Sequence, residues 1–197
     1  MTLDRAGWPF VSGLGALTLV LVVLAPWLAV VGVVLLLFTL NFFRDPDRQP
    51  PGDPGAVVSP ADGKIIRADG TRLSIFMNVF DVHVCRSPVA GRVTSVVHES
   101  GSFLAAMKDE ASEHNERTVI VIQTPEGHPV RFVLVAGLIA RRIVCRISEG
   151  RIVGAGERVG IIRFGSRVDL DVPEGVTVAV AVGDRVVAGQ TVLARRA

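Results

Sequence analysis

The N-terminal part of the chain contains the stretch WPFVSGLGALTLVLVVLAPWLAVVGVVLLLFTLNFF, residues 8–43, which has no Asp, Glu, Lys or Arg. One helical crossing of a bilayer needs about 20 apolar residues, so the stretch is nearly twice that length. Pro26 lies near its middle, and proline lacks the N–H that a continuous helix requires. The stretch therefore predicts either a helical hairpin, residues 11–25 and 28–40, or one kinked crossing with an interfacial end.

Basic residues flank this stretch on both sides, with Arg5 before it and Arg44 and Arg48 after it. Because basic residues concentrate on the cytoplasmic side of membrane segments, the pattern predicts a location at the cytoplasmic face of the cell membrane. A cleaved signal peptide is the alternative, but its apolar core is usually 7–15 residues long and a small-residue cleavage site follows it. Residues 44–197 remain, and they are enough for a packed core.

The composition excludes several classes of protein. The chain has 197 residues with 21 Lys and Arg against 19 Asp and Glu, and this balance does not predict a nucleic-acid partner. Two cysteines, Cys85 and Cys145, cannot build a disulfide framework, which favours a reducing compartment. The four histidines do not have the spacing of metal ligands, so no metal site is expected.

After a linker rich in proline and aspartate, the chain reads as mainly β. The pattern predicts a sandwich or barrel. The turn sequences SPADG and SPVAG share one pattern of residue types, which hints at an internal duplication. Residues 182–193 resemble the hairpin of biotinyl and lipoyl carrier domains. A barrel-sandwich-like domain, present once or duplicated, is therefore expected. Residues 103–114 predict a short helix or loop instead. The predicted strands are residues 57–58, 64–67, 73–79, 92–98, 118–123, 130–135, 142–147, 160–163, 177–182 and 186–193.

Three local features are candidates for chemistry. Asp62 lies in the turn SPADG, Asp81 and His83 are two residues apart and would share one face of a strand, and Gly165-Ser166 interrupts a β pattern. Each alone also fits a turn, a structural histidine or a β-bulge. The motifs of the α/β-hydrolases, the P-loop proteins and the dinucleotide-binding proteins do not occur.

Together these features resemble the phosphatidylserine decarboxylase family, and the short chain and apolar N-terminus resemble its small prokaryotic subgroup. Arg167 follows Gly-Ser where many larger members carry Thr or Ser. Arg86 stands where the larger enzymes have a second histidine, so that histidine's role does not transfer. The matching segments are Phe42-Phe-Arg-Asp-Pro-Asp-Arg48, Ser59-Pro-Ala-Asp-Gly63, Phe80-Asp-Val-His83, Asn115-Glu-Arg117 and Phe164-Gly-Ser-Arg-Val-Asp169.

The resemblance implies a proenzyme that cuts itself between Gly165 and Ser166. Ser166 would attack the Gly165 carbonyl, with His83 as the base, Asp62 as the group that orients it and Asp81 as a second orienting carboxylate. Ser166 would then become a pyruvoyl group, the one cofactor expected. Cleavage would give a β chain, residues 1–165, and an α chain, residues 166–197, which stay together as a heterodimer.

The resemblance also implies the reaction. The pyruvoyl group would form a Schiff base with phosphatidylserine and release CO2 to give phosphatidylethanolamine, so the expected partners are a phospholipid and the membrane. A serine phospholipid of the archaeal type is an alternative substrate, and homo-oligomerisation stays open. A non-enzymatic membrane-anchored carrier or adaptor of barrel-sandwich type is the alternative from another class. A carrier requires a lysine at a hairpin tip, and neither Lys64 nor Lys108 fits that position.

Overall fold

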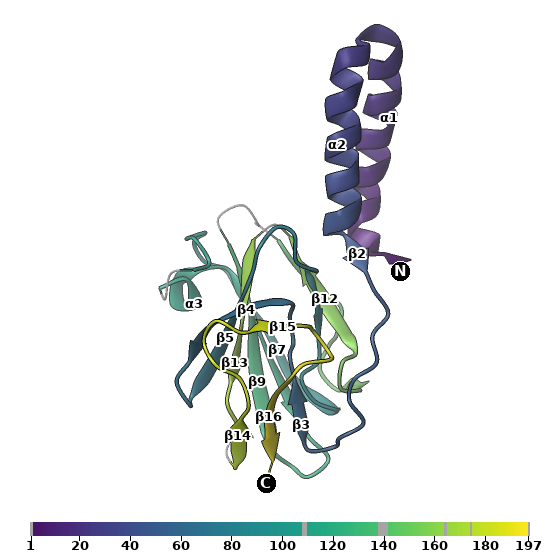
Figure 1. Cartoon of the computed structure of the whole chain (residues 1–197). Coiled ribbons are helices and arrows are strands. Elements are labelled where there is room, and N and C mark those ends of the chain that lie inside the picture. Colours follow the sequence, from purple (N-terminus) through teal and green to yellow (C-terminus); the bar gives the residue numbers. More distant parts are fainter. Residues whose placement is uncertain (1, 108–109, 138–141, 164, 174, 197) are drawn as a thin grey trace. The chain divides into compact units, whose positions relative to one another are not determined.

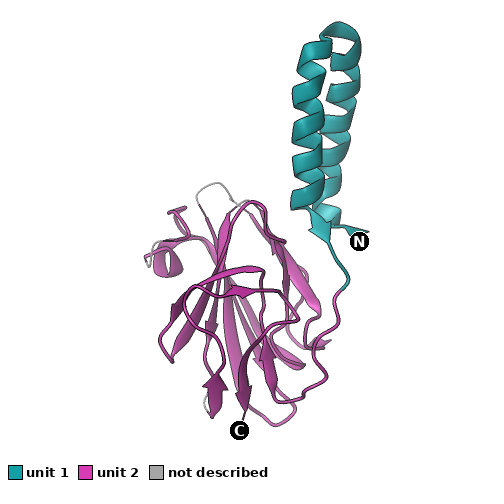
Figure 2. Cartoon of the chain, viewed as in Figure 1, with its two compact units in different colours: residues 1–47 teal, residues 48–197 magenta. Residues whose placement is uncertain are grey.

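The computed structural model describes residues 2–107, 110–137, 142–163, 165–173 and 175–196. It divides into two compact units, Met1–Asp47 and Arg48–Ala197 (Figure 2). Phe164 of the Gly-Ser motif and Lys108 lie outside the described residues.

The first unit is a pair of apolar helices, α1 (Trp8–Leu24) and α2 (Pro26–Phe42), packed side by side (Figure 1). Pro26 occupies the first turn of α2, where backbone N–H groups have no hydrogen-bond partner within the helix, so the missing N–H of proline costs no helical bond. A 3-10 turn, η1 (Arg5–Gly7), precedes α1. The short strands β1 (Thr2–Leu3) and β2 (Arg44–Asp45) pair antiparallel, so the chain leaves this unit beside the point where it enters.

Small residues allow the two helices to approach closely. A Cβ atom on Gly32 would lie 2.6 Å from Oγ1 of Thr18 on the other helix. Most large apolar side chains of both helices are exposed, Val23 to 80% and Trp27 to 72%. Among the described residues, Arg5–Leu24 is the one helix long and apolar enough to cross a membrane, judged by length and composition, and Pro26–Phe42 is a shorter apolar helix.

The second unit is mainly β, as the sequence predicts. Its described residues include one short helix, α3 (Ala111–His114), inside the segment expected to interrupt the strands. An eight-stranded sheet has the order β11-β7-β8-β9-β13-β5-β4-β15, and two three-stranded sheets have the orders β10-β12-β6 and β14-β16-β3. The strands are β3 (Ala56–Val58), β4 (Gly63–Ala68), β5 (Arg72–Met77), β6 (Val84–Arg86), β7 (Gly91–Glu99), β8 (Arg117–Gln123), β9 (Pro129–Ala136), β10 (Ile143–Cys145), β11 (Ile152–Val153), β12 (Arg158–Ile162), β13 (Ser166–Asp171), β14 (Val176–Val178), β15 (Arg185–Val186) and β16 (Val192–Arg196).

One face of the large sheet carries the core. Strand alternation places Val168 and Leu170 of β13 in the main hydrophobic cluster, together with Ile75, Phe132 and Leu134 of the neighbouring strands. Arg167 and Asp169 therefore point to the opposite face of the sheet. This alternation also fixes the register, because a slip by one residue would exchange the two faces.

The turns SPADG and SPVAG have the same structure. Ser59 and Ser87 each donate their hydroxyl to the backbone carbonyl two residues later, at 2.6 Å in both turns. Gly63 and Gly91 then begin β4 and β7 with φ of 144° and 159°, and each pairs with a two-residue strand, β15 or β11. A side chain at either glycine would overlap a carbonyl of the adjacent strand. The pattern of residue types that the two sequences share thus reflects two equivalent turns.

Candidate active site

Ser166 is the first residue of β13 and lies between two strand ends. Its register partners are Met77, the last residue of β5, and Ala136, the last residue of β9. Gly165 directly precedes it with φ of +68°, a left-handed conformation that glycine adopts without steric cost. A Cβ at Gly165 would meet no atom of the described residues within 4 Å, so the backbone angle is the observed reason for glycine there.

The Ser166 side chain is fully buried. Its Oγ atom has no hydrogen-bond partner among the described residues. Leaving a buried hydroxyl unsatisfied costs about 1–3 kcal/mol, so native proteins rarely do so without a functional reason. Within the described ranges, no competing hydrogen bond therefore occupies this hydroxyl.

His83 belongs to the same rim of the domain. The segment 77–83 is bound at both ends to the segment 162–166: Met77 pairs with Ser166, and the His83 carbonyl accepts a hydrogen bond from the Ile162 N–H at 3.3 Å. The His83 ring is fully buried, and its Nδ1 atom lies 3.0 Å from the carbonyl oxygen of Asp81. Since that oxygen can only accept, Nδ1 carries the proton, and the buried Nε2 is the basic atom.

Asp81 shapes the turn that carries His83. Its carboxylate accepts the Asn78 N–H at 2.8 Å and pairs with Arg185 at 3.1 Å, while its own N–H bonds back to the Asn78 carbonyl at 3.0 Å. Asp81 and His83 precede β6, so the expectation that they share a strand face is wrong. The turn closed by Asn78 interrupts the strand, and the contact of Asp81 with the ring comes from its main chain.

Asp62 contacts a residue that sequence reasoning did not pair with it. Its carboxylate forms a two-pronged ion pair with Arg48, with Nη2–Oδ2 at 2.8 Å, and also accepts the Ala188 N–H at 2.8 Å. The two side chains are 7% and 14% exposed, so the pair is mostly buried. The His83 ring is not among the partners of Asp62 in the described part of the chain, and the role of Asp62 in orienting that ring stays a prediction.

A buried polar network on the other face of β13 was also missed. Arg167 is fully buried and donates from Nε to Asp169 at 2.6 Å and from Nη2 to Ser74 at 2.8 Å. Asp169 in turn accepts the hydroxyl of Ser112 in α3 at 2.6 Å. The alternation in β13 puts both charges on one face, but it does not reveal that α3 supplies a hydroxyl to them. The network therefore ties α3 to the strand that begins with Ser166.

The nearby cysteine is not a nucleophile. Cys85 lies in β6, two residues after His83, and is fully buried. Burial, together with the charges of Asp62 and Cys145, raises the pKa of its thiol far above the usual range. The thiol therefore stays protonated and unreactive at neutral pH.

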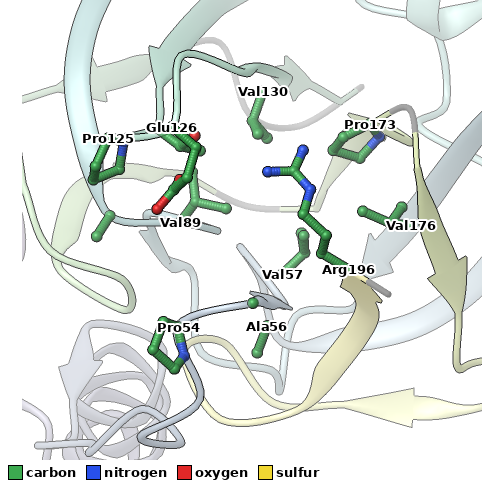
Figure 3. Close-up of a pocket in the computed structure, with 13 residues that line it drawn as sticks. Pro54, Ala56, Val57, Val89, Pro125, Glu126, Val130, Pro173, Val176 and Arg196 are labelled. Carbon is green, nitrogen blue, oxygen red and sulfur yellow. The ribbon is translucent and has the colours of Figure 1, made fainter.

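A cavity of about 370 Å³ lies elsewhere in the domain, beside β3, β14 and β16. Its walls are mostly apolar, and Figure 3 shows Arg196 extending its guanidinium between Val130 and Pro173. Neither Ser166 nor His83 lines it. Among the described residues, no group of three or more His, Cys, Asp or Glu side chains is arranged to hold a metal ion.

Comparison with known proteins shows the family of the chain. A family model described as phosphatidylserine decarboxylase matches residues 35–194. A phosphatidylserine decarboxylase proenzyme of Desulfotalea psychrophila is 46% identical over 203 aligned residues, covering 96% of this chain and 94% of the relative. One of Granulibacter bethesdensis is 44% identical, covering 96% of this chain and 83% of the relative. The chain therefore belongs to the phosphatidylserine decarboxylase family.

Proposed function

We propose that this phosphatidylserine decarboxylase proenzyme cuts itself between Gly165 and Ser166 and turns Ser166 into its pyruvoyl group. The observation that carries the proposal is the fully buried Ser166 hydroxyl, which has no hydrogen-bond partner among the described residues and follows a left-handed Gly165. A serine in this position is ready to attack the carbonyl that precedes it.

The cleavage chemistry uses groups of the chain itself. Ser166 Oγ attacks the Gly165 carbonyl carbon, the C–N bond breaks, and an ester replaces the peptide bond. A base then removes the Cα proton of Ser166, the Cβ–O bond breaks, and Gly165 leaves as a carboxylate. The dehydroalanine that remains takes up water and releases ammonia. The serine oxygen is first the nucleophile and then the leaving group, which explains why it is needed.

His83 is the base that we propose for the first step. Its Nδ1 faces the Asp81 carbonyl, so Nε2 is the ring atom that would accept the Ser166 proton, and the 77–83 and 162–166 segments are bound together at both ends. Asp81 contributes by closing the turn before His83. We propose that Asp62 orients the His83 ring, as the resemblance implies; its carboxylate is itself held in place by Arg48 and the Ala188 N–H.

The Ser166 position fits a pyruvoyl group. A cut before Ser166 frees the first residue of a strand that stays paired with β5 and β9 on both sides, so the new end would remain buried. The ketone of such a group supplies an electron sink for the loss of CO2 from the serine headgroup. The product would be phosphatidylethanolamine.

The two products of the cut would remain associated. The α chain would contain β13 to β16, and three of these strands pair directly with strands of the β chain: β13 with β5 and β9, β15 with β4, and β16 with β3. A heterodimer of this kind also fits a duplicated barrel-sandwich domain, an arrangement that the equivalent turns at Ser59 and Ser87 support.

We further propose that residues 1–43 associate with the cytoplasmic face of the cell membrane as a helical hairpin, and that residues 44–197 form the decarboxylase domain. The exposed apolar side chains of α1 and α2 support this, as do Arg5 and Arg44 at its two ends. A phospholipid substrate gives the enzyme a reason to stay at that surface.

The test measures phosphatidylethanolamine formation by the purified full-length chain on vesicles that contain phosphatidylserine with either ester or ether chains. The parent chain should be active and should lose its activity to phenylhydrazine, which reacts with ketones. Ser166→Ala should be inactive, His83→Ala should remain mostly uncut, and His128→Ala, a change of an exposed histidine, should match the parent. Activity in Ser166→Ala, or parent-like cleavage in His83→Ala, would contradict the assigned roles.

A further inference from the structure

The buried side chain of Asn115 joins two segments beside the proposed cut site. Asn115 directly follows α3 and is 2% exposed. Its Oδ1 accepts the Leu104 N–H at 2.8 Å, and its Nδ2 donates to the carbonyls of Leu104 at 2.8 Å and Ala136 at 2.7 Å. Both N–H groups of the amide are thus used, and a carboxylate of the same shape could not make two of the three bonds.

Backbone bonds extend this link. The Ser102 N–H donates to the His114 carbonyl at 2.7 Å, the Glu116 N–H donates to the Ser102 carbonyl at 3.0 Å, and the Ala136 N–H donates to the Glu116 carbonyl at 2.9 Å. Ala136 is the residue of β9 that lies opposite Ser166. The segment 102–107 is therefore held against the strand end that borders the cut site.

Gly137, the next residue, packs against the carbonyl that would be attacked. A Cβ atom on Gly137 would overlap the Gly165 carbonyl oxygen and would lie 3.0 Å from the carbonyl carbon. That Cβ would also be 3.3 Å from the Cβ of Ala106, within the segment that Asn115 holds. Gly137 does not have a positive φ, so the restriction at this position is one of space.

We infer that Asn115 and Gly137 position the Gly165 carbonyl for attack by Ser166. Asn115 fixes Ala136 and the segment 102–107, and the Gly137 backbone between them sets how far the carbonyl can approach β9. This inference rests on the cut site proposed above. Attack requires the reacting atoms to be about 3 Å apart and aligned, and a displacement of about 1 Å costs on the order of 10²-fold in rate.

The test follows self-cleavage of newly made full-length chains in detergent by intact mass over time. Gly137→Ala should slow cleavage by about 100-fold, since the carbonyl must move aside by roughly 1 Å. Asn115→Asp should slow it by at least about tenfold, because the Ala136 bond is lost. The matched controls are Gly52→Ala, where a Cβ would meet nothing within 4 Å, and the exposed Gln123→Glu; both should match the parent.

Two further measurements separate positioning from folding. Each change is also made in the Ser166→Ala chain, where its thermal unfolding should stay close to that of Ser166→Ala alone. The second measurement treats the uncut Gly137→Ala chain with hydroxylamine, which cleaves esters but not peptide bonds. The chain should stay whole, because the ester has not formed. If Gly137→Ala unfolds, two other variants test the inference. One is Asn115→Asp. The other is the double variant Gly137→Ala with Ala106→Gly, which is less crowded and should recover part of the cleavage rate.

Cleavage of both variants at the parent rate would overturn the inference. Cleavage of Gly137→Ala by hydroxylamine would also overturn it, because the ester would then form normally. A reduced cleavage rate that is explained by loss of the fold would overturn it as well. Cleavage of the Ser166→Ala chain would instead refute the cut site itself, whatever the two positioning variants do.

Discussion

The buried ion pair between Arg167 and Asp169 gives the sharpest prediction about stability. Arg167 is fully buried and the Asp169 side chain is 3% exposed, with 2.6 Å between Nε and Oδ1. Removing one partner of such a pair leaves an uncompensated buried charge and costs about 3–5 kcal/mol. For a chain of this size, 1 kcal/mol shifts Tm by about 2–4 °C, so Asp169→Asn should lower Tm by roughly 6–20 °C.

The assay is thermal unfolding of the full-length Ser166→Ala chain in detergent, followed by far-UV circular dichroism. Tryptophan fluorescence would be misleading, since Trp8 and Trp27, the only tryptophans, lie in the helical unit. Asp171→Asn is the matched control two residues along the same strand. Its pairs with Arg72 and Arg131 are both about one-third exposed, so the change should cost at most about 1 kcal/mol.

A double substitution completes this test. Arg167→Met with Asp169→Leu removes both charges, and its stability should return most of the way to that of the parent, because apolar side chains replace a buried pair at little cost. If Asp169→Asn destabilised the chain no more than Asp171→Asn, the buried network could not tie α3 to β13 as described.

Three more predictions concern other parts of the chain. Arg48→Ala and Asp62→Asn should each lower Tm. The double variant should have a Tm no lower than that of the less stable single variant, since each change breaks the same ion pair. Additive losses of Tm would argue against that pair. Cys85 should resist a thiol reagent in the folded chain because burial raises the pKa of its thiol, whereas Cys145, which is only partly buried, should react faster; equal rates would contradict the burial. Gly32→Val should loosen the helical unit, seen as a lower unfolding temperature by Trp27 fluorescence, and an unchanged temperature would speak against the close helix contact.

Sequence reasoning predicted the mainly β class and the apolar N-terminal helices because both depend on local patterns, whereas the barrel-sandwich topology stays a prediction. The apolar stretch with Pro26 near its middle predicts a break between two helices, and alternation in segments such as Val168-Asp-Leu170 predicts strands with one buried face. It left a hairpin and a kinked helix open, since nothing in the local pattern says that Gly32 meets Thr18.

The site was harder to predict because its contacts join distant residues. Spacing suggested a shared strand face for Asp81 and His83, but the turn closed by Asn78 overrides it. Asp62 pairs with Arg48, 14 positions away in the sequence. Both residues lie in segments that match the family, so their opposite charges were the one feature from which this pair could have been predicted. The closeness of Gly137 to Gly165 follows from the register of β9 against β13, which the sequence does not reveal.

The cut between Gly165 and Ser166 is the central claim, and intact mass spectrometry of the purified chain beside a Ser166→Ala variant tests it most directly. The account predicts two polypeptides from the parent, residues 1–165 and residues 166–197, with the smaller one beginning with a pyruvoyl group, and a whole chain from the variant. A whole chain in both samples, or a cut at any other bond, would contradict it.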